Sequence, residues 1–176
     1  MKQFIFIILL FITVSNAKAQ TNDKSKISFA TTIGTGLSMS TPSSTPFTWQ
    51  VLGYYSLTER WSVGAGTGLS FYDKMLIPLY GDVKFRIGRE RKFSPYMEFA
   101  VGYSFAPSDN ANGGFFMNPS IGIQYPLKNK TKLQLAVGYD LQKLERLKKH
   151  TDKYFSKEFE EQLSHHSISI RLGVFF

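Results

Sequence analysis

The chain contains no cysteine and only three histidines among its 176 residues. The lack of thiols excludes disulfide bonds, thiolate metal sites and a lipid anchor on an N-terminal cysteine. Apart from one short run at the start, no apolar stretch approaches the roughly 20 residues that a membrane-spanning helix needs. The fold must therefore do without disulfide bonds and without a spanning helix.

The one apolar run lies just behind the start of the chain. Lys2 precedes the apolar segment 4–14, and Ala17-Lys18-Ala19 follows it as an A-x-A motif. A basic start, a short apolar segment and small residues at the cut describe a secretory signal peptide. We predict that residues 1–19 are a signal peptide and that residues 20–176 form one exported domain.

The charge balance is positive, with 21 Lys and Arg against 13 Asp and Glu, a formal net charge of +8. A basic exported chain fits a partner with anionic lipid headgroups. The basic residues do not interleave with any nucleic-acid recognition motif, so we expect no nucleic-acid partner. The alternative is an ordinary solvated basic surface.

Apolar residues alternate with small or polar residues in successive stretches of the chain. The last eleven residues, HSISIRLGVFF, are apolar at every second position and end on an aromatic residue. A period of two over about ten residues is the signature of a strand. The same rhythm fills seven earlier segments, 27–39, 47–57, 61–71, 77–87, 95–105, 115–125 and 132–142.

The connections between these eight predicted strands alternate in length. The short ones are 58–60, 88–93 and 126–131; the longer ones are 40–46, 106–114 and 143–165, and 72–75 is an exception. Short turns at one end and longer loops at the other are typical of outer-membrane barrels. We predict an all-β fold, an eight-stranded antiparallel up-and-down transmembrane β-barrel with its short turns in the periplasm.

Two features favour an apolar face that points to lipid. The polar face carries most strand glycines, which suit the narrow interior of an eight-stranded barrel but would weaken a solvent-facing strand. Aromatic residues of the apolar face gather near the strand ends, as in interfacial girdles. The alternative is a soluble sandwich or lipocalin-like barrel with its apolar face inside. Pro78 and Pro119 cannot donate to a ladder, so we expect both near the outer rim.

In these features the chain resembles the small eight-stranded outer-membrane β-barrel proteins of Gram-negative bacteria, over about residues 27–176. The resemblance implies a fold and an outer-membrane location, with no particular activity. In that family the barrel-assembly machinery reads a final strand that ends in an aromatic residue. The matching residues here are Ile170, Leu172, Val174 and Phe176. The alternative is a plain closing strand. We expect a monomer in contact with outer-membrane lipid.

Charged residues on the polar face should point into the lumen. They are Asp82, Lys84, Arg86, Glu98, Asp140 and Arg171. Because isolated buried ions are costly, we expect these charges to be paired. A tight turn around residues 89–92 would set Lys84 opposite Glu98. We predict a hydrogen-bonded plug, and the alternative is the lining of a pore.

His165 and Ser167 lie two residues apart and thus on one face of a strand. Some outer-membrane lipid deacylases have a His-x-Ser pair on an eight-stranded barrel, and nucleophilic catalysis needs such a base beside a hydroxyl and a third group. Ile168 and Ser169 do not continue that motif, and no acid is marked as the third member. We predict no catalytic residues, no cofactor and no metal site, and interpret His165 and His166 as surface-loop residues.

The longest connection, residues 143–165, is basic in its first part. Phe155, Phe159 and Leu163 recur at steps of four, which allows a short helix. We predict an outer loop that contacts lipopolysaccharide phosphates or a partner; the alternative is a solvated loop. The function we predict is a structural or surface-interaction role for a barrel with a largely plugged lumen. The alternatives are a narrow passive channel for small solutes and a hydrolase similar to lipid A deacylases.

Overall fold

The computed structural model describes residues 26–39, 45–72, 74–89, 92–107, 111–127, 131–152 and 155–176. The predicted signal peptide, residues 1–19, lies outside these ranges. Within them the structure is all-β. The strands are β1 (Ile27–Ser38), β2 (Phe47–Ser56), β3 (Trp61–Phe71), β4 (Met75–Arg86), β5 (Ser94–Phe105), β6 (Ala111–Asn112), β7 (Gly114–Pro126), β8 (Lys132–Asp152) and β9 (Phe155–Phe175). No helix in the described ranges is long and apolar enough to cross a membrane.

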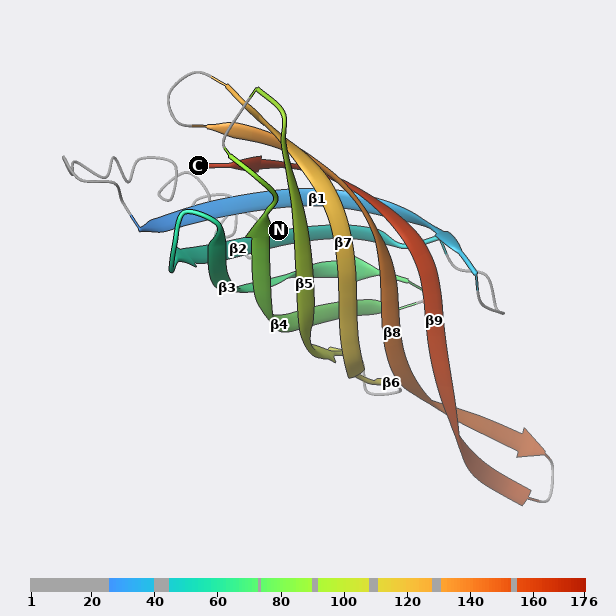
Figure 1. Ribbon diagram of the computed structural model, residues 1–176. Coiled ribbons are helices and arrows are strands. Elements are labelled where there is room, and N and C mark those ends of the chain that lie inside the picture. Colours follow the sequence, from blue (N-terminus) through green and yellow to red (C-terminus); the bar gives the residue numbers. More distant parts are fainter. Residues whose placement is uncertain are drawn as a thin grey trace, which may run out of the picture.

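The long strands form one closed antiparallel sheet. Each pairs with the next along the chain, apart from the two-residue β6, and β9 returns to pair with β1 (Figure 1). At the closure, the backbone N–H of Phe176 donates to the carbonyl of Phe29 at 2.8 Å, and the N–H of Phe29 donates back at 3.2 Å. The predicted eight-stranded up-and-down barrel is confirmed.

The two faces of the sheet are divided as the sequence predicts. Along β5, Met97, Phe99 and Val101 are exposed, whereas Glu98 and Ala100 between them are buried. The same alternation runs through most of the other long strands where their side chains are described; in β3 it is lost at residues 62–64 and 68–69, which are all of intermediate exposure. An apolar surface of this extent is far larger than a soluble monomer exposes, and an outward apolar band is what a transmembrane barrel presents to lipid.

The strands β8 and β9 continue beyond the other strands as a two-stranded ribbon (Figure 1). Their pairing is unbroken from Lys132 opposite Phe175 to Asp152 opposite Phe155, and β6 adds two pairs to the side of β8. The predicted loop over 143–165, with its short helix, is therefore wrong. A spacing of four residues fits one face of a strand as well as one face of a helix, and the ladder that continues out of the barrel favours the strand.

The two prolines interrupt one ladder each. The β3–β4 ladder skips the positions between Leu79 and Leu76, around Pro78. The β7–β8 ladder skips the positions between Met117 and Ser120, around Pro119. Pro78 lies near the start of β4, towards the end of the barrel opposite the short turns. Pro119 lies in the middle of β7, so its predicted place at the rim is wrong. The barrel tolerates it there because the ladder on the other side of β7 stays paired.

Candidate functional site

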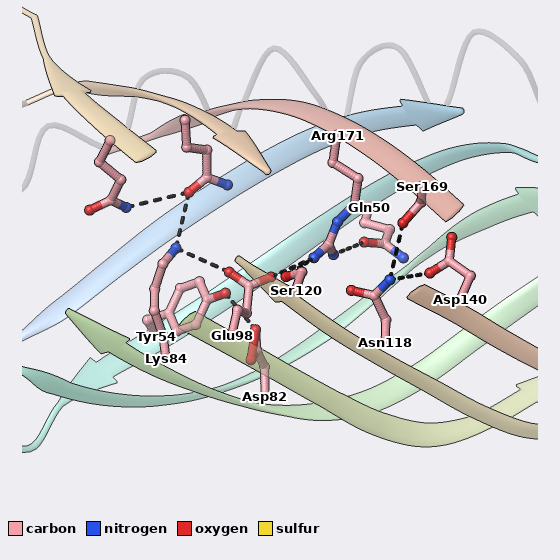
Figure 2. A network of polar contacts seen from close by, with 12 residues as sticks. Gln50, Tyr54, Asp82, Lys84, Glu98, Asn118, Ser120, Asp140, Ser169 and Arg171 are labelled. Carbon is pink, nitrogen blue, oxygen red and sulfur yellow. Dashed lines mark hydrogen bonds and ion pairs between the residues drawn. The ribbon is translucent and has the colours of Figure 1, made fainter. Parts of the chain in front are cut away.

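The lumen contains a cluster of buried charged side chains from four strands. Asp82 and Lys84 come from β4, Glu98 from β5, Asp140 from β8 and Arg171 from β9, and each is between 2 and 6 % exposed. Figure 2 shows them converging inside the barrel. They converge because each occupies an inward position of its alternating strand, and the register sets Lys84 opposite Glu98 as the sequence predicts.

Glu98 is the centre of this cluster. Its Oε2 lies 3.3 Å from Lys84 Nζ, and its Oε1 lies 3.1 Å from Arg171 Nη2. Arg171 also donates to Ser120 Oγ at 2.6 Å and to Gln50 Oε1 at 3.4 Å. One carboxylate therefore compensates two buried cations. Charge-assisted hydrogen bonds of this kind are the strong ones, and their loss would leave both cations uncompensated away from water.

Lys84 lies in an aromatic cage. Its Nζ is 4.3 Å from the ring centroid of Tyr96, 4.9 Å from that of Tyr54 and 5.1 Å from that of Phe175. It also donates to Gln134 Oε1 at 3.0 Å. Ring faces attract a desolvated cation. Since Phe175 is the last residue of β9, these rings form an aromatic layer between the ion pairs and the end of the barrel that holds the short turns.

The two aspartates have partners of their own. Tyr54 OH donates to Asp82 Oδ2 at 2.6 Å. Asn118 donates to Asp140 Oδ1 and, at 3.3 Å, to Ser169 Oγ. Arg86, at the end of β4, is half-exposed and donates to the backbone carbonyl of Glu59. The structure thus places Arg86 at the rim, apart from the central cluster.

Apolar and aromatic side chains fill the lumen around the charges. The buried set is Ala30, Leu52, Tyr54, Tyr80, Ala100 and Phe116, with Phe175 packed against it. Towards the end of the barrel opposite the short turns, Leu76 of β4 packs with Leu144 of β8. The interior of an eight-stranded barrel is just wide enough for its side chains. The geometry is that of a packed core.

His165 and Ser167 lie inside the lumen, towards the end of the barrel opposite the short turns. Both are buried, and the register sets them opposite Gln142 and Asp140 of β8. The His165 ring packs against Tyr72 with centroids 5.4 Å apart. The interpretation of His165 as a surface-loop residue is wrong, because β9 begins well before it and its alternation turns position 165 inward. His166 is half-exposed and contacts Tyr139 OH.

Neutral members of the cluster were missed at the sequence level. Gln50, Ser120 and Gln134 bind the charged groups, but which neutral residue meets which charge depends on the relative stagger of strands far apart in sequence. Tyr54 and Phe175 did carry a signal. Each is a large aromatic residue at an inward position of its strand, with a small or polar residue at an adjacent inward position, Ser56 beside Tyr54 and Gly173 beside Phe175.

The fold is shared with solved outer-membrane barrels. The structure superposes on Neisserial surface protein A with a TM-score of 0.59 and 11 % identity, over 86 % of this chain and 96 % of that one. For the outer membrane protein AlkL the values are 0.57 and 11 %, over 92 % and 94 %. For the N-terminal barrel of Pseudomonas aeruginosa OprF they are 0.50 and 12 %, over 85 % and 97 %. No protein-family model matches the sequence, and no curated protein is significantly similar to it. At these identities the likeness concerns the fold alone.

Proposed function

We propose that this protein is an outer-membrane barrel with a closed lumen, whose role is structural or is exerted at the cell surface. The observation that carries the proposal is the cluster of Lys84, Glu98 and Arg171. Paired charges, buried and packed among aromatic rings, close the lumen instead of lining a water-filled path. The outward apolar surface supports the bilayer location, and the fold is that of outer-membrane barrels.

The closed lumen is tested by conductance in a planar bilayer. The full mature protein, shown to be inserted by its co-flotation with vesicles, should produce no steady openings above the bare bilayer. Steady single-channel openings would contradict the plug and would favour the narrow passive channel for small solutes. The buried ion pairs give the physical reason, since a permeating ion would have to displace partners that are costly to separate.

The surface role is assigned to the ribbon of β8 and β9. With the short turns in the periplasm, the ribbon stands at the outer end of the barrel, and its basic residues are Lys143, Arg146, Lys148, Lys149 and Lys157. Such a segment suits the phosphates of lipopolysaccharide or an anionic partner. The outward residues of the closing strand, among them Ile170, Leu172 and Phe176, are proposed as the signal for the barrel-assembly machinery.

Trypsin added to intact cells should cut this ribbon first, after Lys148 or Lys149. A two-stranded ribbon outside the barrel is marginally stable, and exposed chain is where proteolysis concentrates. Arg89 and Lys92, in the turn between β4 and β5, should be cut only after the outer membrane is breached; mass spectrometry of the fragments identifies the order. Cleavage of the β4–β5 turn in intact cells would show that the barrel has the opposite orientation and would contradict the surface role.

A lipid hydrolase is less well supported. His165 and Ser167 point into the lumen, on the opposite side of the wall from the acyl chains of a surrounding bilayer. A base and a hydroxyl can act only on a substrate within hydrogen-bond reach. The proposed role is therefore not that of an enzyme. When the protein is overproduced, we expect the lipid A of the cells to stay unchanged.

A further inference from the structure

A groove of about 520 Å³ crosses the outward wall of the barrel over β3, β4, β5, β7 and β8. Its lining is almost entirely apolar. It lies where Pro119 interrupts the β7–β8 ladder, between the larger Phe99 and Ile121. The volume falls in the range of cavities that hold small organic ligands. Since the groove opens on the same face as the lipid-exposed side chains, its occupant must come from the bilayer.

The groove runs from the edge of the apolar band near the short turns towards the middle of the band. At its lower end are Trp61, the first residue of β3, and Phe85, near the end of β4, with ring centroids 4.7 Å apart. At its upper end are Ile121 and Val137, which are register partners. Ile121 lies five residues before Pro126, the end of β7 at a short turn, and Val137 lies five residues after Lys132, the start of β8 at the same turn. A chain lying in the groove would thus run from the periplasmic interface into the bilayer.

Basic residues follow or precede the strand ends at the lower end of the groove. Arg60 directly precedes Trp61, is exposed, and accepts a hydrogen bond on its carbonyl from the N–H of Arg86 at 2.8 Å. Arg89, in the next turn of the same rim, is also exposed. Among the described residues of these two turns Glu59 is acidic, whereas Arg60, Arg89 and Lys92 are basic, so the described part of the rim keeps a positive balance. Positive charge at a membrane surface attracts anionic headgroups by about 1 kcal/mol per residue.

We propose that this groove binds an anionic phospholipid of the periplasmic leaflet. One acyl chain lies along the apolar lining from Trp61 to Val137, and the phosphate meets Arg60 at the rim. The inference rests on the proposed membrane location. It adds a lipid site on the outer wall, distinct from the cluster in the lumen, and assigns Trp61 to the entrance of that site.

Trp61 gives a direct readout, because the chain has only two tryptophans. The Trp49→Phe variant, with Trp61 as the sole emitter, is inserted into phosphatidylcholine vesicles that contain acyl-brominated phosphatidylglycerol or acyl-brominated phosphatidylcholine. Brominated phosphatidylglycerol should quench half of the Trp61 fluorescence at a mole fraction about fivefold lower than brominated phosphatidylcholine does. A factor of about five is expected when one arginine binds the anionic headgroup. Adding Arg60→Gln should abolish the difference. Val137→Phe, which fills the groove, should reduce it, whereas Leu135→Phe, outside the lining on the same face, should not.

Equal half-quenching by the two lipids would overturn the site, and so would a preference that Val137→Phe and Leu135→Phe leave equally intact. The absence of quenching by either lipid would show that Trp61 does not face a bilayer. That result would contradict the membrane location itself, and is distinguishable from a failure of the groove alone.

Discussion

Replacement of Glu98 by alanine is expected to lower the free energy of unfolding by about 3–5 kcal/mol, the range for removing one partner of a buried ion pair. In the parent protein Lys84 Nζ lies 3.3 Å from Glu98 Oε2, and Arg171 Nη2 lies 3.1 Å from Glu98 Oε1. The substitution would leave both cations without this carboxylate inside the lumen. The measurement is equilibrium urea unfolding of the protein in vesicles, followed by tryptophan fluorescence.

Two variants separate this effect from a general loss of a glutamate. Glu59→Ala, in the exposed turn between β2 and β3, should stay within about 0.5 kcal/mol of the parent. The triple variant Lys84→Met, Glu98→Met and Arg171→Met should recover most of the lost free energy of unfolding. Three apolar side chains of similar volume leave no uncompensated charge in the lumen. Unfolding of Glu98→Ala at the same urea concentration as the parent would mean that the lumen is hydrated and the plug is absent.

The second large effect is expected for Gly102→Ala, which adds a methyl group to the interior of β5. Its Cβ would lie 2.1 Å from the carbonyl oxygen of Leu79 and 2.5 Å from Tyr80 Cα. Those are backbone atoms of the neighbouring strand, which cannot rotate away. Overpacking of this kind costs about 1–3 kcal/mol and sometimes more, and the same urea titration measures it.

Gly81→Ala is the matched control, on the adjacent strand and the opposite face. A Cβ there has no heavy atom closer than 4.0 Å. The substitution should be neutral or should stabilise the barrel by about 0.4–1 kcal/mol, since it restricts the unfolded chain. Equal losses in the two variants would show that the inward and outward faces are equally packed, and would contradict the narrow lumen.

The period of two explains why the barrel could be predicted from the sequence. Each strand must divide its side chains between two faces, so a residue such as Glu98 is assigned inward by counting alone. The short turn between β4 and β5 then fixes Lys84 opposite Glu98, because hairpin register follows from turn length. Local pattern and local turn geometry were sufficient for these pairs.

Other features depend on distances that the sequence does not contain. Arg171 meets Glu98 and Ser120 across the lumen, and that meeting depends on the stagger of the whole closed sheet. Phe155, Phe159 and Leu163 fit a helix and a strand equally, so only their pairing with β8 favoured the strand. His165 was assigned to a loop because the unusual length of β9 has no local signal.

The claim that apolar residues face lipid and charged residues face the lumen is tested most directly along β5. The chain has no native cysteine, so single cysteines at positions 97, 98, 99, 100 and 101 can each carry one spin label in vesicles. Collision rates with oxygen, which concentrates in the bilayer, should peak at 97, 99 and 101 and fall at 98 and 100. Peaks at 98 and 100, or a preference for a water-soluble nickel reagent at 97, 99 and 101, would contradict the account.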